Sequence, residues 1–223
     1  MQPGLRDLST GRWGLLMAPI RPWKKHNIKN FHAAFVFMDE ATRPRLTAKM
    51  TTTDTPRLAT RISTTSDSNV VFAHALVGPS DLLVGVKGGS PAALVKTIQT
   101  KIRKNVDRLS FVHRIQSHIV ISSEGRIDFS KEAFHRQFSG DGKANRPMRA
   151  WILATAAEPN LRTLTKSLRK NPQIMMIALV LGRYDYFIFV EAEDMKAMQA
   201  VVDKCVRGSE DFVTTDTRIV MQE

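Results

Sequence analysis

Hydrophobic positions along the chain form two series with the same order of elements. In each series, short apolar runs typical of strands alternate with segments whose apolar residues recur at helical spacing. In the first series, strand-like runs cover 31–38, 69–77, 82–88 and 113–122, with helix-like segments at 53–63 and 91–106. In the second, they cover 149–157, 174–181, 186–192 and 212–221, with helix-like segments at 161–168 and 195–205. Both series predict the order strand, helix, strand, strand, helix, strand.

Capping signals support the predicted helices. Ser90 followed by Pro91 is typical of an N-cap with proline at the first helical position, and Thr55 with Pro56 repeats the signal in the preceding helix. The spacing of Leu94 and Ile98 continues every four residues and indicates one apolar helix face.

This element order is the ferredoxin-like plan, in which four antiparallel strands carry both helices on one face. The other face of the second sheet would hold large apolar residues such as Trp151, Met176, Phe187 and Phe189. Such a face needs a cover. We therefore expect an α+β protein with two ferredoxin-like βαββαβ units paired sheet to sheet, the arrangement called a dimeric α/β-barrel.

The predicted units divide the chain into four parts. Residues 1–31 form a basic leader, 32–122 the first unit and 149–223 the second. The intervening stretch, 123–148, is polar, contains glycines and a proline, and lacks sustained periodicity. It is interpreted as a linker.

The net charge of +12 is concentrated before residue 123. Residues 1–31 hold six basic and one acidic side chain, 32–122 hold twelve and six, and 149–223 hold ten of each. The basic first half gives direct nucleic-acid binding as one hypothesis, with the densest candidates at Lys101, Arg103, Lys104 and Arg108. A solvated helix face is the alternative.

Other features limit the class of protein. Cys205 is the one cysteine, so neither a disulfide framework within the chain nor a multi-cysteine zinc site is expected. The apolar runs are far shorter than a spanning helix requires, so we expect a cytoplasmic protein without a membrane partner. The basic leader leaves an organelle transit peptide as an alternative.

Two turns of similar sequence, GPSD at 78–81 and GRYD at 182–185, join the middle strands of the two units. Around the second turn, residues 149–223 resemble the effector-binding domain of the Lrp/AsnC family, also called the RAM domain. They share its G-x-aromatic-D hairpin, its amphipathic helix and a last strand with threonines. The first unit resembles it more loosely, because Ser80 stands where Tyr184 stands.

The resemblance implies a stand-alone sensor with two tandem RAM-like domains. Such a protein would bind an amino acid or related metabolite, form homo-oligomers and act in transcriptional or metabolic regulation. Neither 1–31 nor 123–148 has the pattern of the helix-turn-helix that usually accompanies this domain. DNA recognition would then belong to a DNA-binding partner protein.

The candidate ligand site lies at the second turn and the last strand. Asp185 is suited to an ammonium group, the ring of Tyr184 to an apolar side chain, and the threonine hydroxyls to a carboxylate. The expected ligand-binding residues are Gly182, Tyr184, Asp185, Thr215 and Thr217, with Asp81 as a weaker counterpart. The alternative is structural, because turn aspartates often bind nearby backbone and threonines favour strands.

A small enzyme of the dimeric α/β-barrel type is the alternative function. The sequence gives it little support, because no nucleophile–base pair, paired carboxylates or metal-ligand spacing stands out. His74 lies between apolar residues in a strand and is interpreted as a core histidine, while His113 and His118 would point to opposite faces of theirs. We therefore expect no catalytic residues, no metal and no cofactor.

Overall fold

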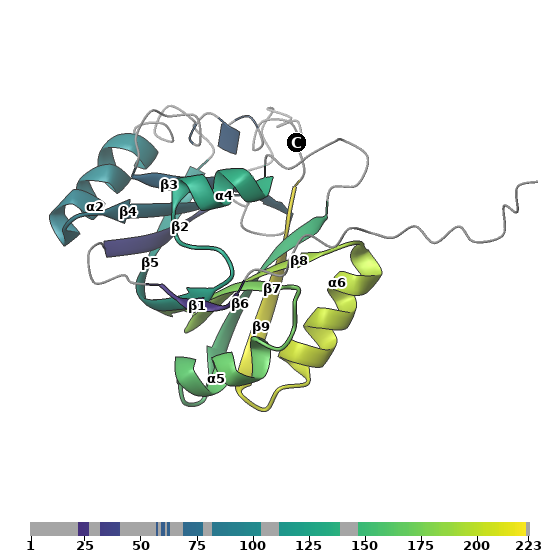
Figure 1. The fold of residues 1–223 in the computed structure, drawn as a ribbon. Helices are drawn as coiled ribbons and strands as arrows, with labels where there is room; N and C mark the ends of the chain where they lie inside the picture. Colours follow the sequence, from purple (N-terminus) through teal and green to yellow (C-terminus); the bar gives the residue numbers. More distant parts are fainter. Residues whose placement is uncertain are drawn as a thin grey trace, which may run out of the picture.

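The computed structural model describes residues 22–26, 32–40, 57, 59–60, 62, 69–77, 82–103, 112–138 and 147–221. The strands are β1 (Lys24–Lys25), β2 (His32–Glu40), β3 (Val70–Val77), β4 (Leu82–Gly88), β5 (Val112–Gly125), β6 (Met148–Ala156), β7 (Ile174–Leu181), β8 (Tyr186–Ala192) and β9 (Phe212–Val220). The helices are α2 (Pro91–Thr97), η2 (Ile98–Arg103), α4 (Lys131–Phe138), α5 (Leu161–Leu168), α6 (Met195–Val201) and η3 (Val202–Arg207) (Figure 1). None of the helices in these ranges is long and apolar enough to cross a membrane.

The strands form one antiparallel sheet that closes on itself. Its order is β1-β5-β2-β4-β3-β9-β6-β8-β7, and β5 also pairs with β7. Counted within each unit, the order is 4-1-3-2 in both, as the ferredoxin-like plan requires. The predicted α+β class with two paired βαββαβ units is confirmed.

Two junctions close the ring, and each joins the second strand of one unit to the last strand of the other. At β3–β9, Leu76 pairs with Val220 and Val77 with Ile219. At β5–β7, the pairing runs from Ile119–Leu181 to Gly125–Met176. The two units thus meet through strand edges as well as through sheet faces.

The inner faces of both units share one aromatic core. Phe35 of β2 lies 4.6 Å from Phe187 of β8 between ring centroids, and Trp151 of β6 lies 5.3 Å from Phe72 of β3. All four side chains are at most 4% exposed. Each aromatic pair adds about 0.5–1.5 kcal/mol beyond its area burial, so this core holds the two sheets together.

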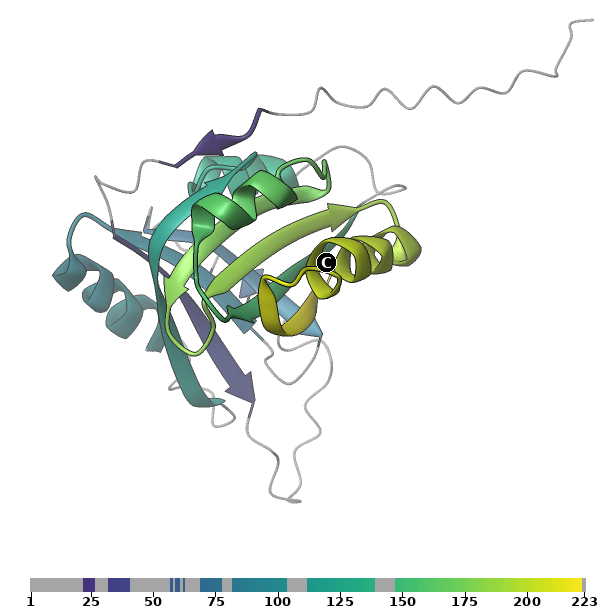
Figure 2. The same ribbon diagram turned by 90° about the horizontal axis from the view of Figure 1, so that it is seen from below.

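The helices cover the outer faces. Figure 2 shows α2 outside one side of the closed sheet and α5 and α6 outside the opposite side. The predicted cap at Ser90 is present, because its hydroxyl accepts from the Ala93 N–H at 3.1 Å. In both units the second helix ends in a six-residue π-helical segment, η2 and η3. The predicted cap at Thr55 lies outside the described residues.

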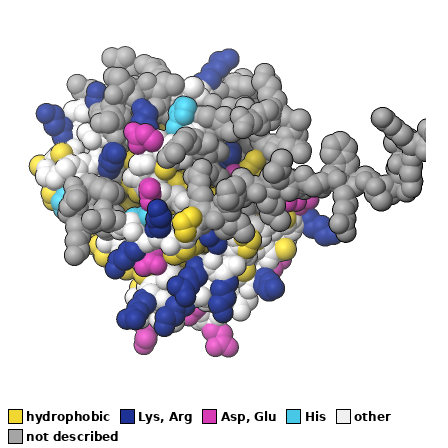
Figure 3. Space-filling view, viewed as in Figure 1, with side chains coloured by type: hydrophobic (Ala, Val, Ile, Leu, Met, Phe, Trp, Pro, Cys, Tyr) yellow, Lys and Arg dark blue, Asp and Glu magenta, His cyan; other side chains and the backbone are white. Residues whose placement is uncertain are grey.

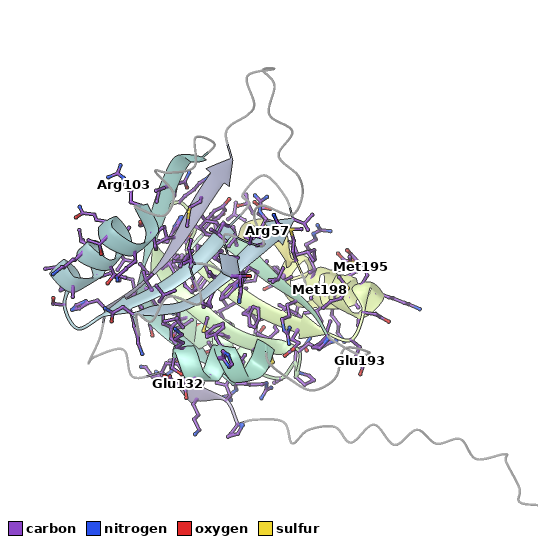
Figure 4. The ribbon with its side chains drawn as sticks, turned by 90° about the horizontal axis from the view of Figure 1, so that it is seen from above. Arg57, Arg103, Glu132, Glu193, Met195 and Met198 are labelled. Atoms are coloured by element: carbon purple, nitrogen blue, oxygen red, sulfur yellow. The ribbon has the colours of Figure 1, made fainter. Side chains whose placement is uncertain are left out.

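The methionines of α6 divide between core and solvent. Met198 is 1% exposed and belongs to the outer core of the second unit, whereas Met195 is 54% exposed. In Figure 4 both lie at α6, on the opposite side of the molecule from Arg103. Met195 therefore does not fill the core.

Residues 123–138 of the predicted linker are part of the folded core. They contain the end of β5 and helix α4, whose hydroxyl cap is Ser130. Ile127, Phe129 and Phe134 are at most 3% exposed and join the aromatic core between the sheets. These residues show no periodicity in the sequence because irregularly spaced apolar residues can be buried by tertiary packing along a non-repeating path. The domain boundaries themselves stay a prediction.

We expect Phe134→Ala to lower the free energy of unfolding by about 3–5 kcal/mol, since a buried ring would leave a cavity. Phe134 is 1% exposed and its ring lies 4.5 Å from that of Phe72. Urea unfolding measures the change. Val95→Ala on α2 is the control, because Val95 is 50% exposed and should cost less than about 1 kcal/mol. Similar small losses for both variants would show that α4 does not seal the core.

Candidate ligand-binding site

The turn between β7 and β8 is shaped by a close approach to the first unit. A Cβ atom at Gly182 would lie 2.1 Å from Nδ1 of His118, which is on β5. Glycine is therefore required at this position because the ring of His118 occupies the space. This contact gives Gly182 a structural role apart from any ligand.

Asp185 connects the same turn to the end of β6 through hydrogen bonds. Its Oδ2 accepts from the Ala156 N–H at 2.8 Å, and its own N–H donates to the Ala154 carbonyl at 2.9 Å. Its carbonyl accepts from the Val180 N–H at 2.8 Å. Within the described parts of the chain the other carboxylate oxygen has no hydrogen-bond donor. Asp185 thus has the backbone-binding role of the structural alternative and keeps one oxygen for a further partner.

Tyr184 points toward the barrel interior. Its ring packs against the aromatic core, 5.9 Å from His118 and 6.3 Å from Phe187. Its hydroxyl donates to Asp216 at 3.4 Å, and Asp216 forms an ion pair with the buried Arg218. Both the hydroxyl and the ring of Tyr184 therefore make contacts within the protein.

Thr215 and Thr217 lie on the other side of the sheet. In the β6–β9 register they pair with Ala154 and Ile152, which belong to the outer core under α5 and α6. The inward-facing β9 residues are Asp216 and Arg218 instead, opposite Leu153 and Trp151. The sheet therefore separates the threonines from Tyr184, and the residues proposed from sequence do not form one cluster. Asp81 lies outside the described residues.

A pocket of about 300 Å³ opens on the outer side, where β6 ends and α5 begins. Ala156, whose N–H is held by Asp185, lines it together with Tyr186 at the start of β8. In the sheet register Tyr186 pairs with Ala154, and Ala154 pairs with Thr215. Of the expected residues, Asp185 is therefore bonded to a residue that lines this pocket, whereas Thr215 lies two strands away from Tyr186.

The pocket is acidic. Its lining, as far as the described residues form it, includes three carboxylates, Glu158, Glu210 and Asp211, and no basic residue. Tyr186 is 1% exposed, and burial, together with the charges of Asp185 and Asp211, raises its pKa to about 12. A backbone hydrogen bond at Asn160 opposes this shift. The phenol therefore stays neutral at physiological pH, and the surroundings favour a positively charged ligand group.

The histidines of the interior are buried and neutral. His74 accepts from Nε1 of Trp151 at 3.0 Å, and burial, with a smaller contribution from Arg149, lowers its pKa to about 3. His118 is 2% exposed, neither ring nitrogen has a partner among the described residues, and burial followed by Arg183 lowers its pKa. In the part of the chain that the structure describes, no group of three His, Cys, Asp or Glu residues could hold a metal ion.

The comparison with protein families decides what the second unit resembles. Residues 150–223 match the Lrp/AsnC ligand binding domain. This match confirms the resemblance seen around the GRYD turn. It covers β6 to the end of the chain and none of the first unit, so a second tandem copy at 32–122 stays a prediction. A search of curated proteins found no match to the chain.

Solved structures support the closed-barrel fold. The siroheme decarboxylase NirDL superposes with a TM-score of 0.56 at 7% identity, over 90% of this chain and 74% of that one. An anthrone oxidase-like protein gives a TM-score of 0.51 at 9% identity, over 89% and 93% of the two chains. FFRP-DM1 is 24% identical over 33% of this chain and 99% of its own, with a TM-score of 0.32. At these identities the first two show the fold alone.

The residues around the pocket were missed by reasoning from sequence. Tyr186 could have been assigned to the outer face, because strand alternation from the inward Phe187 places it there. Glu210 and Asp211 lie in an irregular turn before β9 and Glu158 in a bend after β6, so no periodicity points to them. The G-x-aromatic-D pattern drew attention to Tyr184 instead.

We expect His74 to make the protein less stable as the pH falls. Because its pKa is about 3 in the folded state and near 6.5 when unfolded, the unfolded chain binds an extra proton below pH 6.5. The full stability contribution is present above pH 6.5 and decreases toward pH 3, by at most about 1.4 kcal/mol per pH unit.

Unfolding measured from pH 8 to 4.5 tests this dependence. His74→Gln keeps an acceptor for Trp151 and cannot titrate, so its free energy of unfolding should change less steeply with pH than that of the wild type. His32→Gln removes an exposed histidine and serves as the control. Identical slopes for the wild type and His74→Gln would show that His74 is not held neutral by the core.

Proposed function

We propose that this protein is a ligand-sensing regulator whose second unit binds an amino acid or a related small metabolite. The observation that carries the proposal is the family match over 150–223, together with a pocket in that same unit. Sensing would act in transcriptional or metabolic control, through a partner that binds DNA. The family match supports the general role, and the ligand class is our inference from the pocket.

The pocket chemistry favours a ligand that carries an ammonium group. Glu210 and Asp211 line one side, and Glu158 lies beyond the end of β6. Charge-assisted hydrogen bonds to an ammonium are about twice as strong as neutral ones. Asn160 and Tyr186 add neutral polar groups, and Leu164 adds an apolar surface for a side chain. Of the expected residues, Asp185 would hold Ala156 in place at the pocket, and Thr215 would lie beside Ala154 on the neighbouring strand. Tyr184 and Thr217 would not reach the ligand.

The enzyme alternative has less support. The neighbours of similar fold include a siroheme decarboxylase, but at 7% identity that likeness concerns the fold. In this protein the barrel interior is occupied by Phe35, Phe72, Trp151, Phe187 and Phe189. Among the described residues that line the pocket outside the barrel there is no histidine or arginine that could act on a substrate.

Association of copies belongs to the same proposal. Three apolar side chains stand exposed on the β5–β7 junction: Ile119 at 37%, Ile121 at 51% and Leu181 at 67%. Ile119 and Leu181 pair directly in the sheet register. A contiguous apolar surface of this kind is typical of an interface, which supports the expected homo-oligomer.

Calorimetric titration with the twenty amino acids tests the pocket. Replacing both Glu210 and Asp211 by their amides should weaken binding of the amino acid that binds best by roughly two- to 30-fold, since both carboxylates are exposed and each ion pair at an exposed position contributes about 0.2–1 kcal/mol. The matched control is Glu193→Gln with Asp203→Asn, which changes the net charge equally at exposed positions away from the pocket.

Three outcomes would contradict the proposal. If no amino acid binds the wild type, the assigned ligand class is wrong. If both double variants weaken binding equally, only net charge matters. If Asp185→Asn abolishes binding while the pocket double variant does not, the ligand sits at the GRYD turn.

A further inference from the structure

One exposed face of the second unit carries a stripe of basic side chains, which begins beside the acidic pocket at Glu158. Arg162, Lys166, Arg169 and Lys170 are exposed along α5 and the turn that follows it, while Leu164 and Leu168 face the core. Residues 159–172 contain no acidic residue. Within the described residues, none of these four basic side chains forms an ion pair.

The leader strand β1 extends this face. Arg126 donates to the Arg169 carbonyl at 2.9 Å, and its guanidinium lies 5.5 Å from the ring of Trp23. Trp23 precedes the exposed Lys24 and Lys25, which pair with the end of β5. Residues more than a hundred positions apart in the sequence are thus brought together. We name Lys24, Lys25, Arg126, Arg162, Lys166, Arg169 and Lys170 the basic face. Figure 3 shows many Lys and Arg side chains, with some Asp and Glu among them, over the lower part of the molecule, where Figure 1 places β1 and α5.

The other exposed helix of this unit is different. On α6 and η3, Asp203 accepts from both Gln199 and Arg207, and Glu193 and Asp194 precede the helix. Its charges are mixed and partly paired, as expected of a solvated helix surface. Among the described residues the four basic side chains of α5 and its following turn have no such pairing, so they repel one another unless a polyanion neutralises them. On β1, by contrast, Lys25 lies opposite Glu124 in the sheet register.

We propose that the basic face binds the phosphate backbone of duplex nucleic acid, independently of the amino-acid pocket. From Arg162 to its last residue, Leu168, helix α5 rises by about 9 Å, which matches roughly two to three phosphate steps along one strand, and Arg169 and Lys170 follow directly. Trp23 is half-buried, bonded to Glu124 and covered by Arg126, so it offers no platform on which unpaired bases could stack. Backbone contact with a duplex therefore fits better than binding of single strands, which relies on stacking.

This face is not the one that the sequence suggested. The densest basic run of the first half lies partly on η2, with Lys101 and Arg103 exposed there. In Figure 4 Arg103 lies at the far end of the first unit. Lys104 and Arg108 lie outside the described residues.

Fluorescence anisotropy of a labelled duplex of about 20 base pairs, over a series of KCl concentrations, tests the proposal. The triple variant Lys166→Gln, Arg169→Gln, Lys170→Gln changes exposed positions and keeps helix propensity. If these residues contact phosphates, near 0.1 M salt the triple variant should weaken binding by about 50-fold or more, and the slope of log affinity against log salt should flatten by about 2–3.

Two triple variants with the same change in net charge serve as controls. One replaces Lys196, Lys204 and Arg207 on α6 and η3, and the other replaces Lys96, Lys101 and Arg103 on α2 and η2. Both should change affinity far less than the α5 variant does. Equal losses in all three variants, or a larger loss from the α2 variant, would overturn the assignment to the basic face.

Competitors distinguish the class of polyanion. A single strand of the same length and vesicles of phosphatidylserine with phosphatidylcholine should bind more weakly than the duplex at equal salt. Tighter binding to the single strand or to the vesicles would overturn the proposal, as would a wild-type protein that fails to bind the duplex even at low salt.

Discussion

The double closure of the sheet is the constraint on which the rest of this structure depends. A single ferredoxin-like unit leaves two open strand edges and one uncovered apolar face. Pairing β3 with β9 and β5 with β7 satisfies the edges, and it places the two inner faces against each other. The length of β5, residues 112–125, follows from this requirement, because its first part pairs with β2 and its last part with β7 and β1.

The closed sheet also determines which parts of the protein a small molecule can reach. The interior is filled by aromatic side chains of the strands and by Phe129 and Phe134 from the segment after β5. The inner face of the sheet is therefore closed to solutes, and helices cover the outer face. Inside the barrel Asp216 and Arg218 form an ion pair, whereas neither ring nitrogen of His118 has a partner among the described residues. The ends of strands, where helices begin and turns meet, remain open to solutes, and the acidic pocket lies at such a place.

Much of the fold was predictable from the sequence, and less of the site. Strand and helix periodicity gave the element order, because each element buries one regular face. Residues 127–134 could not be predicted as core, since Ile127, Phe129 and Phe134 are buried by an irregular path rather than a periodic one. The face of each site residue depends on register: Thr215 and Tyr184 seemed close in a linear pattern, and the sheet places them on opposite sides. The basic charge of α5 was not apparent when charges were summed over the whole second unit. Residues 149–223 have equal numbers of basic and acidic side chains, whereas every charged residue in 159–172 is basic.

We conclude that the two units share one interior and unfold together as a single cooperative domain. Native-state hydrogen exchange at increasing denaturant concentration tests it most directly, because it resolves the opening free energy of each strand. We expect the slowest amides of β2 and β4 in the first unit and of β6 and β8 in the second to share one opening free energy and one denaturant dependence. Two separate sets of values, one for each unit, would contradict a common core and would show that the units fold as independent domains.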